Sequence, residues 1–276
     1  MTVASAREWT PFSRYRHSLW LLTRRDLKVR YSTSFLGYFW SILDPLVMAG
    51  IYWVVFTVVF HRGGTSPEPY IVFLLTGLLP WMWFSGAVSD TTRAFLREQK
   101  LIRSTKIPRT IWILRLVLSK GIEFLASIPV LAVFAIATQF AIDPAQRAQL
   151  HWEAFLSIIA FVLEGVLIIG IGLIVAPLVV FFRDLERAVK LILRFLFYAS
   201  PIVYGLTDAR LVHRVNLDRI LAFNPLTGIF SLYRSAFFPK ELDLFAVAVS
   251  AVLCFVVLII GIIVYRRTIH SVLKEI

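Results

Sequence analysis

The sequence predicts an all-α integral membrane protein with six transmembrane helices. Of its 276 residues, 58% are hydrophobic and only 17% are charged, whereas a soluble domain carries about 25% charged residues. The apolar residues gather in long runs, and about 20 consecutive apolar residues suffice to cross a bilayer as a helix. Lysine and arginine concentrate in alternate connecting segments, the pattern of segments that stay cytoplasmic. This charge bias places both termini in the cytoplasm.

Residues 1–34 are predicted to be cytoplasmic and to carry an amphipathic interface helix. Between residues 12 and 31, apolar side chains such as Trp20 and Leu27 interleave with arginines and a lysine. A helix of this kind lies in the headgroup region, with its aromatic side chains at the interface and its cations toward anionic lipid. The alternative is a frayed cytoplasmic tail.

Residues 35–276 are predicted to form one six-span domain. The first span is the apolar run 35–60, and the others are 70–88, 111–140, 155–182, 189–204 and 244–265. Because the third run is longer than the hydrocarbon core, its first turns are expected to project toward the cytoplasm.

Two connecting segments contain more apolar residues than solvated loops require. The cytoplasmic segment 89–110 mixes cations with Phe95, Leu101 and Ile102, which favours a short amphipathic helix that meets a cytoplasmic partner. A simple charge anchor for the membrane topology is the alternative. The outer segment 205–243 is predicted to form two short helices that dip back into the membrane, divided at Asn224 and Pro225.

The fourth predicted span combines small residues with a carboxylate. Gly165, Gly170 and Gly172 allow close helix packing, and Pro177 allows a kink. Glu164 lies well inside the apolar run, and a carboxylate in hydrocarbon is a functional candidate by default. A proton-coupled secondary carrier would use it as a relay. A structural role, with a hydroxyl or a cation on a neighbouring helix as partner, is the favoured interpretation.

Aromatic residues are abundant, with 23 Phe, 9 Tyr and 8 Trp. For each single residue, packing or an interfacial belt is the better explanation. Collectively they would suit a conduit for sugar, whose C–H faces stack on aromatic rings. The candidate channel aromatics are Tyr52, Phe56, Trp81, Trp83, Phe197 and Tyr198.

Several classes of function are disfavoured by the sequence. The chain contains no GxxxxGK[ST] phosphate-binding loop, no HExxH motif and no GxSxG motif. We therefore expect no metal and no cofactor in this chain. A membrane enzyme acting on lipid-linked sugars would have only Asp44 and Asp90 as loose catalytic candidates. The net charge of +12 does not indicate nucleic-acid binding, because no polar domain displays it.

Four motifs in order along the chain give a specific resemblance. They are RRDLKVRYSTSFLGYFWSILDPL at residues 24–46, KIPR at 106–109, FRD at 182–184, and NPL at 224–226 followed by Tyr233 and Arg234. In these motifs the chain resembles the membrane subunit of type-2 ABC exporters of lipid-linked polysaccharide. This family includes O-antigen and galactan exporters and the related teichoic-acid exporters.

The resemblance implies a homodimer in the bacterial inner membrane that works with two separate ATPase chains, which would bind ATP and magnesium. The cargo would be a polyprenyl-linked galactan or O-antigen, with teichoic acid as an alternative. It implies an N-terminal interface formed by Arg24, Arg25, Asp26, Lys28 and Arg30. It implies ATPase coupling through Arg97, Leu101, Ile102, Lys106, Pro108 and Arg109. The re-entrant segment would act as a gate, with Asn224, Pro225, Tyr233 and Arg234 as its key residues.

Overall fold

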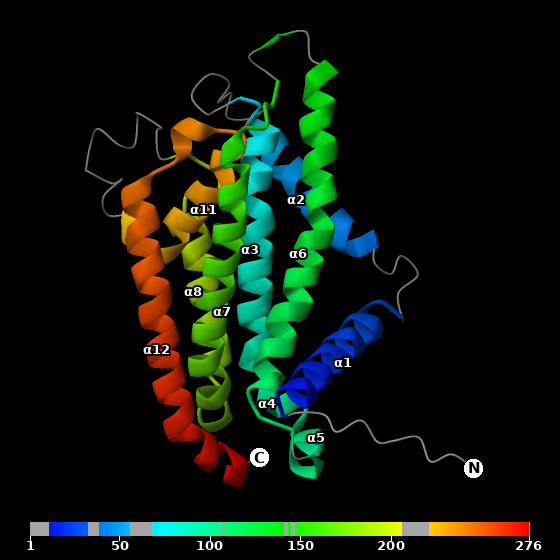
Figure 1. Cartoon of the computed structure of the whole chain (residues 1–276), viewed down its shortest axis with the longest axis vertical. Coiled ribbons are helices and arrows are strands. Elements are labelled where there is room, and N and C mark those ends of the chain that lie inside the picture. Colours follow the sequence, from blue (N-terminus) through cyan, green and yellow to red (C-terminus); the bar gives the residue numbers. More distant parts are fainter. Residues whose placement is uncertain are drawn as a thin grey trace.

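The computed structural model describes residues 11–32, 39–55, 68–105, 107–140, 143–144, 147–205 and 221–275. Every regular element within these ranges is a helix, so the all-α prediction is confirmed. The long helices run roughly side by side in one bundle, and the shorter α1 (Pro11–Ser32) leans against one end of it (Figure 1). The helices α4 (Ala94–Arg97) and α5 (Gln99–Ser104) and the end of α12 (Leu244–Glu275) lie at that same end.

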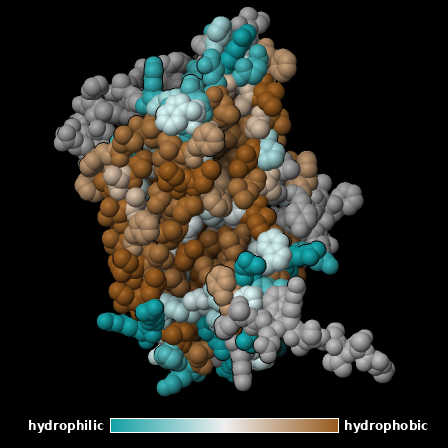
Figure 2. Space-filling view, viewed as in Figure 1, coloured by the Kyte–Doolittle hydropathy of each residue, from teal (hydrophilic) through white to brown (hydrophobic). Residues whose placement is uncertain are grey.

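Four of the described helices are long and apolar enough to cross a membrane. They are α3 (Tyr70–Thr92), α6 (Ile111–Ala137), α7 (Leu156–Phe181) and α12 (Leu244–Glu275). Short 3₁₀ turns extend α6 through η3 (Thr138–Phe140) and precede α7 as η5 (Trp152–Phe155). Apolar side chains cover the middle of the visible face, and hydrophilic ones gather at both ends (Figure 2). The chain is therefore an integral membrane protein.

The first and fifth predicted spans correspond to shorter helices. The helix α2 (Trp40–Trp53) has 14 residues and α8 (Leu185–Ala199) has 15, fewer than the roughly 20 that cross a bilayer without tilt or thinning. The predicted run 35–60 extends beyond the described residues on both sides of α2. The six-span topology thus stays a prediction.

The predicted N-terminal helix is present with nearly the expected bounds, and its place at the membrane interface stays a prediction. The helix α1 covers Pro11–Ser32, against the predicted range 12–31. Leu22 and Leu27 are buried, whereas Trp20 and Leu21 are more than half exposed. One side of α1 therefore packs on the bundle, and an apolar strip remains uncovered.

The segment 89–110 forms two short helices instead of the single one predicted. The helix α3 continues to Thr92, then α4 (Ala94–Arg97) and α5 (Gln99–Ser104) follow, separated at Glu98. Glu98 has φ −117° and ψ 23°, which is not a helical conformation. As described below, its carboxylate binds two arginines, so the break places an acidic group at the centre of an ion-pair network.

The predicted break at Asn224 and Pro225 is confirmed. The helix α11 (Pro225–Ser235) begins at Pro225, and the Asn224 side chain accepts a hydrogen bond from the Leu226 N–H at 3.0 Å. Asparagine is a favoured N-cap, and proline fits the first helical position because its missing N–H would have no partner there. The turn η6 (Pro239–Glu241) follows α11. Residues 206–220, which include the first predicted re-entrant helix, lie outside the described residues.

The helix α3 lies at the centre of the bundle. Its side chains Phe73, Leu74 and Leu75 are completely buried, and α2, α6, α7, α8 and α11 all pack against it. By contrast, only 17% of the most apolar 18-residue stretch of α12 is buried. The outer side of α12 is thus available to lipid, while α3 positions the groups described next.

Candidate functional site

A buried arginine joins α1, the α4–α5 segment and α6. The side chain of Arg115 on α6 is only 3% exposed. Its Nη1 donates to Asp26 Oδ1 at 2.7 Å, and its Nη2 donates to Glu98 Oε1 at 3.1 Å. Arg25 Nη2 donates to the same Glu98 oxygen at 2.5 Å. Two cations and two carboxylates thereby connect segments that are far apart in the sequence.

A second cluster of ion pairs fastens the end of α1 to α3 and α6. Arg30 donates through Nη1 to Glu123 Oε1 at 2.8 Å and through Nη2 to Asp90 Oδ2 at 2.7 Å. Lys120 Nζ donates to the other Glu123 oxygen at 2.7 Å, and Arg97 Nη1 lies 3.7 Å from Asp90 Oδ1. We call these two clusters together the ion-pair network.

The predicted N-terminal interface residues divide into two groups in the structure. Arg25, Asp26 and Arg30 bind partners within the bundle, while Arg24 and Lys28 are exposed. Burial raises the pKa of the Asp26 carboxyl, although the neighbouring Arg115 and Arg25 oppose this shift. Contact with an ATPase stays a prediction for all five residues, and Arg24 and Lys28 are those whose side chains are most accessible.

The predicted coupling residues also divide by burial. Ile102 is completely buried in a cluster with Leu22, Phe95 and Trp112. Arg97, Leu101 and Pro108 are exposed, and Arg109 Nη1 donates to the Thr105 and Ile107 carbonyl oxygens at 2.9 and 2.8 Å. Lys106 lies outside the described residues. Ile102 therefore anchors α5 to the bundle, and Leu101 has an exposed apolar side chain.

A third group of ion pairs connects α8 with the end of α3. The sequence alone does not indicate this connection. Glu186 accepts from Arg93 Nε at 2.5 Å and from Lys190 Nζ at 2.7 Å. These two cations lower the pKa of the Glu186 carboxyl to about 2. The carboxylate thus stays ionised at physiological pH, and its stabilising contribution would be lost only as the pH falls below the ordinary carboxyl range toward 2.

Four of the predicted channel aromatics meet in one groove. The ring centroid of Phe197 lies 5.7 Å from that of Tyr52, 5.5 Å from that of Trp81 and 5.2 Å from that of Tyr198. The groove, of about 470 Å³, runs between α2, α3 and α8 and is also lined by Lys190, Arg194 and Ser89. We call it the aromatic groove. Phe56 lies outside the described residues.

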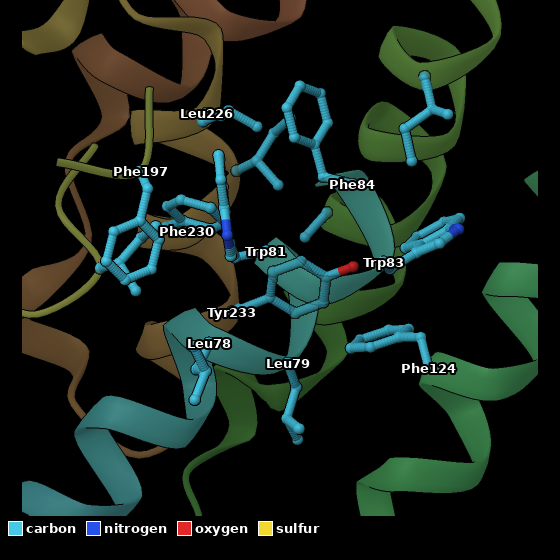
Figure 3. Packing of buried hydrophobic residues seen from close by; sticks show 14 of the residues in the cluster. Leu78, Leu79, Trp81, Trp83, Phe84, Phe124, Phe197, Leu226, Phe230 and Tyr233 are labelled. Atoms are coloured by element: carbon cyan, nitrogen blue, oxygen red, sulfur yellow. The ribbon is translucent and has the colours of Figure 1, made fainter. Parts of the chain in front are cut away.

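The structure does not bring Trp83 into the aromatic groove. Its ring lies 5.4 Å from Phe124 and 4.6 Å from Phe161, and its Nε1 donates to the Val117 carbonyl at 3.2 Å. Figure 3 shows Trp83 and Phe124 on one side of the cluster and Trp81 and Phe197 on the other. Trp83 is 4% exposed and serves packing between α3, α6 and α7.

Glu164 has a structural partner of the kind favoured from the sequence. It is completely buried on α7, and Tyr233 Oη donates to its Oε2 at 2.9 Å. The tyrosine hydroxyl satisfies one carboxyl oxygen in a place where an unpaired polar group is costly. This contact also fixes Tyr233, a predicted gate residue, against α7.

Two further predicted gate residues, Asn224 and Arg234, bind the chain that follows α8. Asn224 Nδ2 donates to Ser200 Oγ at 2.8 Å. Arg234 is buried, donates through Nη2 to the Ile202 carbonyl at 2.7 Å, and lies 3.9 Å above the centroid of the Phe73 ring. The attraction between a cation and an aromatic face is stronger when the pair is shielded from water. Asn224 and Arg234 thereby tie α11 to the chain that follows α8.

Comparison with known proteins places this architecture in a family. Residues 17–238 match the ABC-2 type transporter family. The O-antigen export system permease protein RfbA of Klebsiella pneumoniae is 32% identical over 247 residues, which are 90% of each chain. RfbA of Myxococcus xanthus is 29% identical, with 83% of each chain covered. The polysialic acid transport protein KpsM of Escherichia coli is 26% identical over 91% of this chain and 93% of its own. The chain belongs to the ABC-2 type transporter family.

Proposed function

We propose that this chain is the permease subunit of an ATP-driven exporter that moves a lipid-linked polysaccharide out of the cytoplasm across the bacterial inner membrane. The observation that carries the proposal is the similarity, over about nine-tenths of both chains, to a permease named for O-antigen export. A second relative is named for the transport of another polysaccharide, polysialic acid. Whether the cargo is a galactan, an O-antigen or a teichoic acid stays a prediction.

The active unit is proposed to be a homodimer with two separate ATPase chains. The sequence contains no phosphate-binding loop of its own, so ATP and magnesium would be bound by the partner. The first and fifth spans would be completed around α2 and α8, giving six spans with both termini in the cytoplasm. In this arrangement the aromatic groove would face the second copy, and sugar rings would pass along Tyr52, Trp81 and Tyr198.

The ion-pair network supports a route for coupling. Closure of the ATPase dimer would push on α4 and α5, and Glu98 between them is bound to Arg25 and Arg115. A displacement of α5 would therefore move α1 and α6 as well. Charge-assisted hydrogen bonds hold these helices together strongly. Packed helices switch between a few discrete arrangements, so a shift of one helix is passed on to the others. The segment 205–243 would open at the other end of the bundle.

Replacing Leu101 by Asp is expected to weaken ATPase binding at least about tenfold, the loss expected when a charge enters an apolar contact. Leu101 is exposed, so the chain should insert and fold normally. The measurement is the amount of ATPase that co-purifies with the tagged variant.

Ile102→Asp should instead reduce the yield of folded protein, because Ile102 is buried. The control is Leu150→Asp, at an exposed leucine outside segment 89–110. Undiminished ATPase recovery with Leu101→Asp would contradict this coupling assignment.

Glu164→Gln is expected to leave export unchanged. The amide oxygen of glutamine still accepts the hydrogen bond from Tyr233 Oη, and the buried site loses only a protonatable group. A proton-coupled carrier that uses this carboxyl as a relay would stop transporting. The measurement is the rate at which pulse-labelled glycan reaches the cell surface. Abolished export in a variant that is expressed at wild-type level would favour the carrier interpretation.

The direct test of the proposed function is deletion of the gene in the source bacterium. Without the exporter, lipid-linked glycan should accumulate on the cytoplasmic side while the surface glycan disappears. The wild-type gene should restore the surface glycan. Normal surface glycan in the deletion strain, with no other exporter of this class in the genome, would reject the proposal.

A further inference from the structure

A second polar cavity lies next to the aromatic groove, and the side chain of Met82 on α3 lines both. It has a volume of about 340 Å³ and opens between α1, α2, α3 and α6. Its wall combines cations, carboxylates, a hydroxyl and two indoles. The charged groups and the hydroxyl are supplied by Arg30, Asp44, Lys120, Glu123 and Ser127, and the indoles by Trp40 and Trp83. A third cavity shares Leu79 and Phe124 with this one, but its lining is almost entirely apolar.

Apart from Arg30 on α1, the polar groups of this cavity lie on the apolar helices α2 and α6. Lys120 and Ser127 lie about 14 and 24 Å along α6 from its first residue, at 1.5 Å per residue. Asp44 lies inside the apolar helix α2. Ionisable residues at such positions are costly, face an interior or a polar cavity, and often mark the path of a substrate. A packing role alone does not account for gathering five polar residues around one hollow.

The charges in the wall balance. Arg30 and Lys120 are the cations, and both donate to Glu123. Asp44 supplies the second carboxylate, is exposed, and makes no hydrogen bond or ion pair with the part of the chain that the structure describes. A site for a phosphate group would carry surplus positive charge. A balanced wall with an accessible carboxylate suits a neutral ligand that donates hydroxyl hydrogen bonds.

An exposed indole completes the recognition of a sugar. Trp40 lines the cavity and is 43% exposed. A pyranose ring has apolar C–H faces that pack on an aromatic ring and hydroxyl groups around its edge that bond to carboxylates. The volume falls within the roughly 300–1,000 Å³ that is usual for small-ligand sites. Arg30 belongs both to this wall and to the ion-pair network, so an occupant would lie beside the coupling elements.

We propose that this cavity binds one neutral sugar unit of the exported glycan, with Asp44 accepting from sugar hydroxyl groups and Trp40 packing on a ring face. The proposal rests on the proposed function and deepens it, because it gives the exporter a recognition site for the sugar next to the aromatic groove.

Photo-crosslinking tests this site without ATPase or transport. The full chain is placed in nanodiscs of phosphatidylethanolamine and phosphatidylglycerol. The probe is octyl β-galactoside with a diazirine on the alkyl carbon next to the sugar. Mass spectrometry should locate the crosslinks in peptides 40–48 and 120–127. Asp44→Asn should raise the half-saturating probe concentration about fivefold, because a charge-assisted hydrogen bond becomes a neutral one. Trp40→Leu should raise it similarly.

The chain offers matched controls for both substitutions. Trp53 lies on the same helix as Trp40 and is equally exposed at 43%, but it does not line the cavity. Asp184 is an exposed carboxylate whose side chain makes no capping hydrogen bond. Trp53→Leu and Asp184→Asn should therefore leave the labelling of peptides 40–48 and 120–127 unchanged.

Three results would overturn the assignment. One is labelling of these peptides that is equally strong in Asp44→Asn and Trp40→Leu. Another is equal or stronger labelling by octyl phosphate with the same diazirine, which would make the cavity a site for lipid phosphate. The third is absence of labelling in a chain that restores surface glycan in cells, which would leave the proposed function intact. Conversely, labelling in a chain without export activity would reject the proposed function and keep the sugar site.

Discussion

Replacing Arg115 by Met is expected to detach α1 from the bundle and to destabilise the protein by about 3–5 kcal/mol, the usual cost of breaking a buried ion pair by removing one partner. Asp26 would lose its 2.7 Å contact and Glu98 one of its two arginines. The measurements are the thermal unfolding midpoint of the purified protein and the rate at which protease cuts within α1. Arg187→Met, at an exposed arginine on α8, is the control and should change neither quantity.

A double variant separates stability from coupling. In Arg115→Met with Asp26→Leu, both buried charges are removed, and replacing a buried pair by apolar groups is often neutral or stabilising. The contact between Arg25 and Glu98 remains. We expect the unfolding midpoint to recover while export stays impaired, since the ion pairs that join Arg115 to α1 and to Glu98 are gone and the Arg30–Glu123 pair alone still links α1 to α6 ionically. An unaltered midpoint in the single variant would contradict the role given to Arg115.

Replacing Gly261 by Ala is expected to force α12 away from α7 and to lower stability by about 1–3 kcal/mol, the typical cost of overpacking. A Cβ at Gly261 would lie only 2.4 Å from the Gly170 carbonyl oxygen, where real Cβ atoms do not occur. A Cβ at Gly170 would lie 2.8 Å from the Leu258 backbone nitrogen. The obstacle in both cases is backbone, so rotation of a side chain cannot relieve it. Small residues permit such close approach of membrane helices.

The measurement for the α7–α12 contact is the thermal unfolding midpoint of Gly261→Ala and Gly170→Ala in detergent. Gly50→Ala provides a matched control, because a Cβ at Gly50 would meet nothing within 4 Å. Midpoints for Gly261→Ala and Gly170→Ala that equal those of wild type and Gly50→Ala would show that the two backbones are not in direct contact.

The elements predicted best are those whose cause is local in the sequence. The apolar runs that become α3, α6, α7 and α12 must be helical, since a backbone in lipid has to satisfy its own hydrogen bonds. The start of α11 follows from Asn224 and Pro225, which cap a helix whatever surrounds it. The close packing expected from Gly170 and Gly172 was also predictable, although the partner helices were not.

The pairing of charges could not be predicted in the same way. Counting cations placed residues 24–30 at the cytoplasmic end, but it did not indicate that Arg25 and Arg30 bind carboxylates of the bundle. Arg115 lies 89 residues from Asp26 in the sequence, and only the packing of α1 against α6 brings them together. The resemblance implied a partner interface for Arg25, Asp26 and Arg30, and it did not indicate that these side chains also bind partners within the fold.

Trp81 and Trp83 do not line the same groove, and the sequence contains a signal for this difference. Both tryptophans are predicted to line the channel because they are close in sequence. Residues two apart on an α-helix are rotated by about 200° around the helix axis, so they face nearly opposite sides. Trp81 accordingly faces the aromatic groove, and Trp83 faces Phe124 and Phe161. The cavity beside Asp44 had no such signal, because it depends on how α2 and α6 lie relative to each other.

The central claim, that this permease works with a separate ATPase, is tested most directly by purifying the tagged chain from its own bacterium in mild detergent and identifying what accompanies it by mass spectrometry. We expect a protein with a phosphate-binding loop in equal amount to the permease, and a mass that corresponds to two copies of each. A permease that purifies without any ATPase and still moves glycan in response to a proton gradient would contradict the account.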